Sequence, residues 1–247
     1  MRTYTNLAWP DDPYRASQQL YRRPSPMLAA FAVVPPGRSV ATAAGAVAVV
    51  YLPLHRTRAI TVTEGTLAFG FRAASTADGD CIGRLAGVAD LDLMQARRHA
   101  RFLAGHGLSA DLHALRDAAP GQVNRGLAAV EADWADRQQR ARGTATMIDL
   151  CDDGNDLAAI SRRAGIMASP ASVASSSASG DAAGLRTSEY LAAAAAERAL
   201  AIALAGARGL GQYRWDGTVR TGRVMAVTAW DLFPIVAWDD TGHQPAC

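Results

Sequence analysis

One segment constrains the fold of this chain more than any other: an alanine-rich run at residues 188–207. Its central part reads YLAAAAAERALAIALA, and Gly209 and Gly211 follow it. This composition predicts a helix that ends at the glycines. Because the helix would be apolar around most of its circumference, other elements must cover it on several sides. Glu197 and Arg198 at its centre are costly in lipid, so we interpret the segment as a buried helix of a folded protein.

Runs of strand-like sequence precede this helix. Residues 27–34 and about 45–52 are rich in Ala and Val and flank a Pro-Pro-Gly-Arg turn, which predicts two strands. Residues 59–63 and 66–71 alternate apolar and polar side chains around Glu64-Gly65. That pattern predicts a β-hairpin with Gly at the turn.

From residue 89 onward the apolar period becomes helical. Four apolar residues share one face of the expected helix: Leu93, Ala96, Ala100 and Leu103. Asp90 and Asp92 would lie in its first turn, where the helix dipole favours acids, and Gly105 would end it. Two further helices are expected over residues 109–118 and about 122–142.

Strand and helix then alternate toward the end of the chain. Residues 144–150 predict a strand, and residues 155–164 predict a helix with Asn155 as its cap. After the alanine-rich helix, residues 219–229 and 235–238 predict a closing pair of strands.

Together these patterns predict an α+β fold with an N-terminal antiparallel sheet containing a β-hairpin, a central helical region and a C-terminal strand pair. We expect four segments along the chain. They are an extended arm (1–26), an α+β core domain (27–168), a flexible linker or loop rich in Ala and Ser (169–184), and a region with the alanine-rich helix and C-terminal strands (185–247).

The chain contains no lysine: all 25 basic residues are Arg. A Walker-A phosphate loop, a Schiff-base enzyme and a protein kinase of the usual type each need a lysine, so these classes are excluded. The abundance of Ala, Arg and Gly indicates a GC-rich bacterial or phage genome. Cys81, Cys151 and Cys247 are far apart and form no CxxC pair, which indicates a reducing compartment. We predict no cofactor.

Acidic residues gather after the strand predicted at 144–150: Asp149, Asp152, Asp153 and Asp156. Carboxylates after a strand can hold Mg²⁺ or Ca²⁺, so these residues are candidate metal ligands. The segment begins like a calcium loop, but Cys151 and Ile160 occupy positions that need oxygen ligands. The alternative is a strand-to-helix turn with acids at a helix start. His99, His106 and His113 are seven residues apart, but Gly105 breaks the helix that would align them as metal ligands.

Two groups of arginines are candidates for nucleic-acid contacts. Arg97, Arg98 and Arg101 share one helix face, and Arg162 and Arg163 lie in the segment LAAISRRAGI. That segment resembles the first helix and turn of a bacterial repressor helix-turn-helix, within residues 155–180. The recognition helix would then read PASVASSSAS, which carries no Arg for bases or phosphates. The net charge of +2 gives no overall electrostatic footprint for nucleic acid or an anionic membrane.

Aromatic residues are spaced between prolines in the arm: Tyr4, Trp9, Tyr14 and Tyr21. Such side chains need a surface, which is either this chain's own core or a neighbouring subunit. The arm, the apolar helix and the lack of a catalytic motif favour a non-catalytic structural or assembly subunit of a larger bacterial or phage complex. Its partners would be other proteins or its own copies, in the cytoplasm or in a virion or other assembled particle. A nucleic-acid-binding protein and an enzyme with an acidic site at Asp149–Asp156 are the alternatives.

Overall fold

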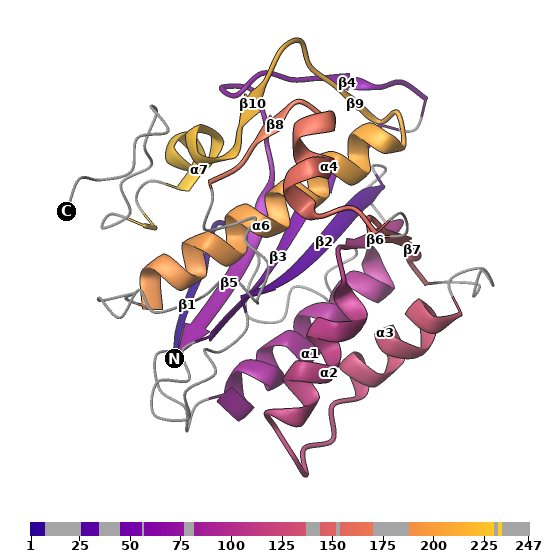
Figure 1. Cartoon of the computed structure of the whole chain (residues 1–247), viewed down its shortest axis with the longest axis vertical. Helices are drawn as coiled ribbons and strands as arrows, with labels where there is room; N and C mark the ends of the chain where they lie inside the picture. Colours follow the sequence, from indigo (N-terminus) through magenta and orange to yellow (C-terminus); the bar gives the residue numbers. More distant parts are fainter. Residues whose placement is uncertain are drawn as a thin grey trace, which may run out of the picture.

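The computed structural model describes residues 1–7, 26–34, 45–55, 57–76, 82–136, 144–151, 154–169, 188–229 and 232–233. A six-stranded mixed sheet lies at its centre, with helices on both faces (Figure 1). The predicted α+β class is confirmed, including the N-terminal antiparallel sheet, the helical middle and paired strands near the carboxyl terminus.

The central sheet has the strand order β1-β5-β3-β2-β6-β7. Its strands are β1 (Arg2–Thr5), β2 (Met27–Val34), β3 (Gly45–Pro53), β5 (Gly70–Thr76), β6 (Phe102–Gly105) and β7 (Thr146–Asp149). The neighbours from β1 to β2 pair in antiparallel fashion, whereas β2, β6 and β7 pair in parallel. A parallel extension therefore continues the antiparallel sheet that the sequence predicts.

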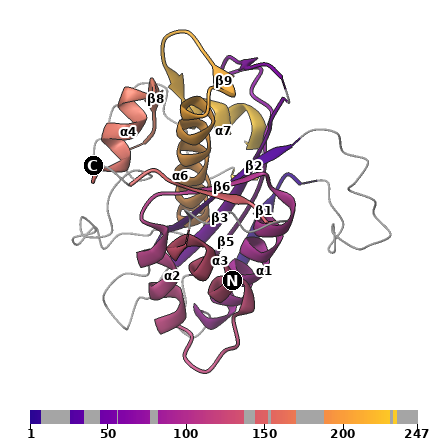
Figure 2. The ribbon, with the colours of Figure 1, turned by 90° about the vertical axis from the view of Figure 1, so that its right-hand side faces the viewer.

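Helices form a layer on each face of the sheet. The long helix α6 (Ser188–Gly209) covers one face, and α1 (Ile82–His99), α2 (Leu108–Asp117) and α3 (Arg125–Ala135) cover the other (Figure 2). Side chains alternate along each strand, so β2 sends Ala30 and Ala32 toward α6 but Phe31 and Val33 toward the three-helix layer.

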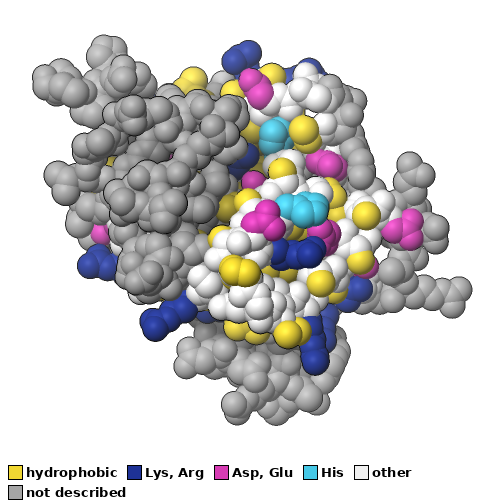
Figure 3. All heavy atoms as spheres, turned by 60° about the horizontal axis from the view of Figure 1, so that its bottom comes forward, with side chains coloured by type: hydrophobic (Ala, Val, Ile, Leu, Met, Phe, Trp, Pro, Cys, Tyr) yellow, Lys and Arg dark blue, Asp and Glu magenta, His cyan; other side chains and the backbone are white. Residues whose placement is uncertain are grey.

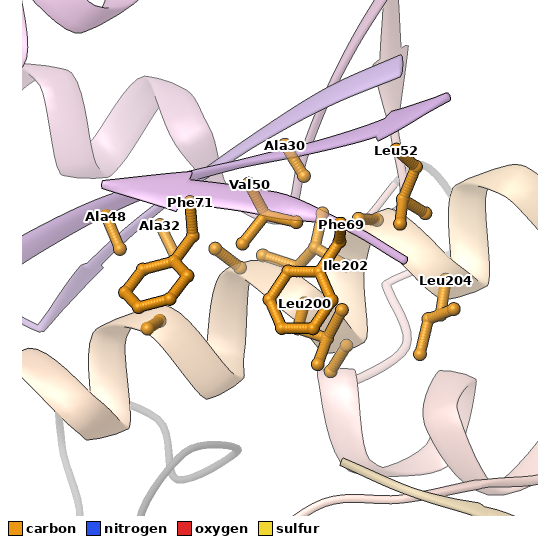
Figure 4. Packing of buried hydrophobic residues seen from close by; sticks show 14 of the residues in the cluster. Ala30, Ala32, Ala48, Val50, Leu52, Phe69, Phe71, Leu200, Ile202 and Leu204 are labelled. Atoms are coloured by element: carbon orange, nitrogen blue, oxygen red, sulfur yellow. The ribbon is translucent and has the colours of Figure 1, made fainter. Parts of the chain in front are cut away.

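The face under α6 is built largely from small side chains. Ala30, Ala32 and Ala48 of the sheet point toward the helix, and Phe71, Leu200 and Ile202 fill the remaining space (Figure 4). A Cβ added at Gly206 would lie 3.4 Å from the Cβ of Ala104, so helix and sheet approach closely there. Among the described residues, α6 is the one helix long and apolar enough to span a membrane, but 83% of its apolar window is buried inside the protein. This burial agrees with the interpretation of α6 as a core helix.

Shorter elements lie around α6: α4 (Leu157–Arg163), β4 (Ile60–Thr61), β8 (Ile166–Met167), β9 (Tyr213–Arg214), β10 (Val219–Arg220) and α7 (Thr221–Ala229). Strand β4 pairs in parallel with β9, and β8 pairs in parallel with β10. The hairpin predicted at residues 59–71 is therefore wrong, although β2 and β3 do form an antiparallel pair. Thr63 and Thr66 close a local turn, and Ile60 pairs with Tyr213 from a distant part of the chain.

The helix predicted from residue 89 to Gly105 is also partly wrong. Helix α1 runs from Ile82 to His99, and Phe102 to Gly105 form strand β6. Ala100 and Leu103 are buried as their spacing suggests, but the backbone of Phe102–Ala104 pairs with β2. Pairing with a strand distant in sequence overrides the helical period here. Asp90 and Asp92 consequently lie in the middle of α1 and not at its start.

The remaining helices differ from the predictions mainly at their ends. Helix α2 lies where residues 109–118 predict a helix. Helix α3 is shorter than the expected 122–142 and leaves Val123 exposed. The cap of α4 is Asp156 and not Asn155, because the Asp156 carboxylate accepts from the Ala159 amide.

The strand predicted at 219–229 is helical after Arg220. Val224 and Met225 of α7 are fully buried, and adjacent buried residues fit either period in so short an apolar run. The second predicted strand, at 235–238, lies outside the described residues, as does most of the linker at 169–184.

Candidate functional site

The parallel strands β2, β6 and β7 stop at the same end of the sheet, at Val34, Gly105 and Asp149. We call this the carboxyl end. From β2 the chain continues to β3 on one side, whereas from β6 it continues to β7 on the other. In open α/β sheets, ligands bind in the crevice outside the carboxyl ends of the parallel strands. Side chains near β2 and β6 at this end are therefore candidates for function.

The turn from β6 into α2 brings several polar groups to the carboxyl end. His106 follows β6, and Gly107 begins α2 in the left-handed region with φ of 66°. Gly107 makes no side-chain cap, so the first amide groups of α2, at Leu108 and Ser109, carry the partial positive charge of the helix terminus. Asp111 lies in the same first helical turn.

Helix α6 brings Arg198 to the same region. The Ser75 hydroxyl donates to the Ser188 carbonyl at 2.5 Å, which places the start of α6 beside the end of β5. Gly206, near the other end of α6, lies against Leu28 and Ala104. Arg198 is about 12 Å along the axis from Gly206. The guanidinium of Arg198 acts electrostatically on Asp111 in the first turn of α2.

Asp111 and Arg198 interact electrostatically across the carboxyl end. Burial raises the pKa of the Asp111 carboxyl to about 7, and the Arg198 guanidinium opposes that rise. Burial also lowers the pKa of Arg198, while Asp111 raises it. A carboxyl that exchanges its proton near neutral pH, beside a specific charged partner at a ligand-binding position of the fold, is a functional candidate.

His106 lies on the side of this region toward β7. Its Nε2 atom is 3.0 Å from the Asn155 carbonyl oxygen. A carbonyl oxygen can only accept, so this contact favours a proton on Nε2 and leaves Nδ1 as the acceptor of a neutral ring. His106 thereby joins the end of β6 to the segment before α4.

The predicted acidic cluster is only partly described, and its described members serve the backbone. Asp149 Oδ1 accepts from the Cys151 amide at 3.0 Å, and Asp156 Oδ1 accepts from the Ala159 amide at 2.5 Å. Asp152 and Asp153 lie outside the described residues. Within the described part of the chain, no group of three or more His, Cys, Asp or Glu side chains is arranged to hold a metal ion.

The predicted nucleic-acid arginines do not act as one group. Arg97 is held by Asp133 through two hydrogen bonds of 2.7 and 3.2 Å, which neutralises its charge. Arg98 is exposed, and Arg101 is exposed with its guanidinium 5.2 Å from the centre of the Phe102 ring. Figure 3 shows arginine, acidic and histidine side chains interspersed over the described part of the three-helix face. That mixture is typical of a solvated helix surface.

Arg162 and Arg163 are both exposed at the end of α4, and Arg163 contacts the Asn155 side chain at 3.5 Å. Strand β8 follows α4 after Gly165, where a helix-turn-helix would continue through its turn. That part of the predicted resemblance is wrong, because Ile166 and Met167 pair with β10. Residues 170–187 lie outside the described residues.

Tyr4, the described member of the aromatic arm set, packs on this chain's own core. Its ring lies 5.0 Å from the ring of Phe233, which stacks on Phe71 at 5.8 Å. Trp9, Tyr14 and Tyr21 lie outside the described residues, so their expected assembly contacts stay a prediction.

A cavity of about 610 Å³ lies at the other end of α2, between its last turn and the start of α3. Arg116, Gln122, Val123 and Arg125 are among the residues that line it. The exposed fraction of Val123 is 81%, so the hollow is an open surface feature. Asp111 is not among the residues that line it.

Sequence reasoning identified neither Asp111 nor the role of Arg198. The available signals were a Gly-His-Gly turn after an apolar run and a charged pair inside an otherwise apolar helix. Comparison adds no relative to these signals: no family model, curated protein or solved structure matches the chain. The functional argument therefore rests on the geometry of this chain.

Proposed function

We propose that the protein binds an anionic, phosphate-type ligand at the carboxyl end and that Asp111 exchanges a proton there. One observation carries the proposal. A carboxyl group from α2 and a guanidinium from α6, on opposite layers of the fold, interact where β6 ends and the chain connections diverge.

The chemistry of the region suits an anion. A guanidinium donates paired hydrogen bonds that match two oxygens of a phosphate group. The uncapped start of α2 adds backbone amides and the positive end of the helix dipole. His106 supplies an imidazole ring whose nitrogen atoms can donate or accept a hydrogen bond.

Asp111 gives the site the potential to act on its ligand as well as bind it. A pKa of about 7 means that the carboxyl populates both protonation states near neutral pH. That condition suits general acid–base catalysis. The proposal keeps the enzyme alternative but moves its centre from Asp149–Asp156 to Asp111. The structural-subunit and nucleic-acid-binding hypotheses stay predictions.

Isothermal titration of the full chain with inorganic phosphate, pyrophosphate and a short single-stranded DNA tests the proposal. Arg198→Gln should weaken binding of the preferred probe at least about tenfold, because the main cation is lost. Arg162→Gln is the matched control, since it removes an exposed arginine outside the site. Asp111→Asn should bind more tightly than wild type, because it removes the charge that competes for Arg198.

The three probes also separate two sources of the phosphate group. Tightest binding of the DNA, lost in Arg198→Gln, would indicate a nucleic-acid phosphodiester. Tightest binding of phosphate or pyrophosphate would indicate a small phosphate ester. Saturable binding by none of the probes, or equal binding by wild type and a folded Arg198→Gln variant, would contradict the proposal.

A further inference from the structure

We infer that Asp216 is a site of spontaneous covalent modification, at which the Asp216-Gly217 peptide converts to isoaspartate. Both residues are exposed and belong to the turn between β9 and β10 (Figure 1). Exposed turns of small and polar residues are where chemical changes to a folded chain are best tolerated. The inference is independent of the anion site proposed above, because it uses no residue of the carboxyl end.

The two reacting groups of this turn are unhindered. With the described part of the chain, the Asp216 carboxylate makes no ion pair or hydrogen bond, and the Gly217 amide makes no backbone hydrogen bond. Gly217 has φ of 69°, and no atom lies within 4 Å of a Cβ added to it. A glycine also has no side chain of its own to shield its amide nitrogen. Rotations within Asp216 can therefore bring its carboxyl carbon to that nitrogen.

The reaction needs no reagent besides water. The Gly217 amide nitrogen attacks the carboxyl carbon of a protonated Asp216 side chain. A C–N bond forms, and the amide proton leaves with the carboxyl O–H group as water, which gives a five-membered succinimide ring. Water then adds to one of the two ring carbonyl carbons and breaks its bond to nitrogen. Opening at the main-chain carbonyl gives isoaspartate, and opening at the side-chain carbonyl restores aspartate.

The residues on either side of the turn bind the same atom, the Gly165 carbonyl oxygen. Trp215 Nε1 donates to it at 3.2 Å, and the Val219 amide donates to it at 2.9 Å. The Gly217 carbonyl oxygen lies close as well, 2.9 Å from the position of a Cβ added to Gly165. Isoaspartate inserts one extra carbon into the backbone between the two donors. We therefore expect the modified turn to lose one of these hydrogen bonds.

The loss should weaken the attachment of α4 and β8 to the rest of the fold. Strand β10 begins directly after the turn and pairs with β8. Thr221, which follows β10, donates its hydroxyl to the buried Glu197 carboxylate of α6 at 2.7 Å. Loss of one hydrogen bond in a chain of this size should lower the Tm of the modified protein by about 2 to 4 °C.

Ageing of the full chain tests the inference. Wild type and Asp216→Glu should be incubated for several weeks near physiological temperature in mildly acidic buffer. Isoaspartate is then located by peptide mapping and counted by methylation with a protein isoaspartate methyltransferase. Asp216→Glu is the matched control, because it keeps the charge but would have to close a six-membered ring, which is slower. Mapping also separates this site from the other Asp-Gly pairs of the sequence, Asp78-Gly79 and Asp153-Gly154.

The Asp117-Ala118 peptide supplies an internal control. Asp117 is exposed like Asp216, but the next residue has a Cβ, and its amide donates to the Ala114 carbonyl oxygen at 3.1 Å. Isoaspartate should therefore be several-fold more abundant at position 216 than at position 117 in aged wild type, and undetectable at position 216 in Asp216→Glu.

Two results would overturn the modification site. One is aged wild type with no more isoaspartate at Asp216 than at Asp117. The other is isoaspartate at Asp216 that forms only in urea, because the folded turn would then prevent ring closure. If isoaspartate forms in the folded protein but the modified and unmodified fractions have the same Tm, the expected loss of a Gly165 contact is wrong and the modification site stands.

Discussion

The two faces of the central sheet are packed in different ways. One long helix, α6, is the main cover of its face and packs on the alanines of β2 and β3. The other face carries large side chains such as Phe31 and Leu103, and three shorter helices together cover it. Small residues thus allow a single apolar helix to suffice, whereas a bulkier face needs several helices that must also be joined to one another.

Polar contacts connect helices of the three-helix layer to one another. Asp90 Oδ1 of α1 accepts from the Leu127 amide at 2.9 Å and so satisfies an amide at the start of α3. Arg97 of α1 binds Asp133 of α3. The α6 layer contains a polar centre of another kind: Glu197 accepts from the Ser169 amide, the Ser169 hydroxyl and the Thr221 hydroxyl at 2.9, 2.5 and 2.7 Å.

Each layer also holds a buried carboxyl, and the two differ sharply. Glu197 is 2% exposed and satisfied by three donors. Asp92 of α1 is 4% exposed, its Oδ1 is 3.4 Å from Arg72, and its Oδ2 has no hydrogen-bond partner among the described residues. Burial raises the pKa of Asp92 to about 7, with Arg72 opposing the rise. Burying the Glu197 side chain in the α6 layer therefore costs less free energy than burying the Asp92 side chain in the three-helix layer.

The largest expected effect comes from separating α1 and α3. A Cβ at Gly126 would lie 2.1 Å from the Asp90 carbonyl oxygen, which is backbone and cannot rotate away. Gly126→Ala should lower the free energy of unfolding by about 3 kcal/mol, measured by urea denaturation. Gly87→Ala on α1 is the matched control, because nothing lies within 4 Å of its added Cβ, and it should stabilise by about 0.5 kcal/mol. Equal effects of the two variants would contradict close packing of α1 on α3.

Replacing each of the two buried carboxyls by its amide should change the free energy of unfolding in opposite directions. Glu197→Gln places an NH₂ group among donors and should destabilise by about 2 kcal/mol. Asp92→Asn removes a poorly solvated charge and should stabilise by about 1.5 kcal/mol at pH 8. A thermal unfolding comparison of both variants with wild type is the measurement, and shifts of the same sign would show that the two layers do not differ in this respect.

The contribution of Asp92 to stability should also depend on pH. The folded-state pKa of Asp92 is raised, so the folded protein holds this proton more tightly than the unfolded chain. The stability it contributes is full below the unfolded pKa, falls between about pH 4 and pH 7, and is lost above. The advantage of Asp92→Asn over wild type should therefore grow across that window and then stay constant.

The smallest effect is expected from placing a larger side chain in the alanine face, the alanine-rich contact between α6 and the sheet. Ala199 of α6 is fully buried in the cluster between helix and sheet. Ala199→Leu should destabilise by about 1 to 2 kcal/mol, since helix and sheet must move apart. Leu112→Met in the three-helix layer conserves volume and should cost less. If urea midpoints show that the leucine is tolerated as well as the methionine, the alanine face is not tightly packed.

The sequence predicted the elements whose signals are local. The alanine-rich run predicts α6 and its burial, and the runs at 27–34 and 45–52 predict β2 and β3. Strand β6 was missed because Leu103 satisfies a helical period equally well, and only pairing with β2 decides between the two. The expected hairpin failed for the same reason: the partner of Ile60 is Tyr213, which no local pattern connects to it.

The candidate site was harder to predict than the fold. Asp111 is an ordinary helical aspartate in the sequence, and its shifted pKa arises only when the fold buries it beside Arg198 of α6. The residues that did attract attention, Asp149 and Asp156, have common local uses in a turn and a helix cap. A site assembled from elements distant in sequence leaves no motif at any one of them.

The contact between Tyr4 and Phe233 sets an order for folding during synthesis. Tyr4 belongs to β1, yet the ring that packs against it is synthesised only after the other five strands of the sheet and helix α6. Strand β1 also needs β5, to which Asn6 and Thr5 bond at the Phe71 backbone. The edge strand β1 can therefore reach its final packing only after α6, α7 and Phe233 have been synthesised, and until then a growing chain leaves that edge of the sheet open to chaperones.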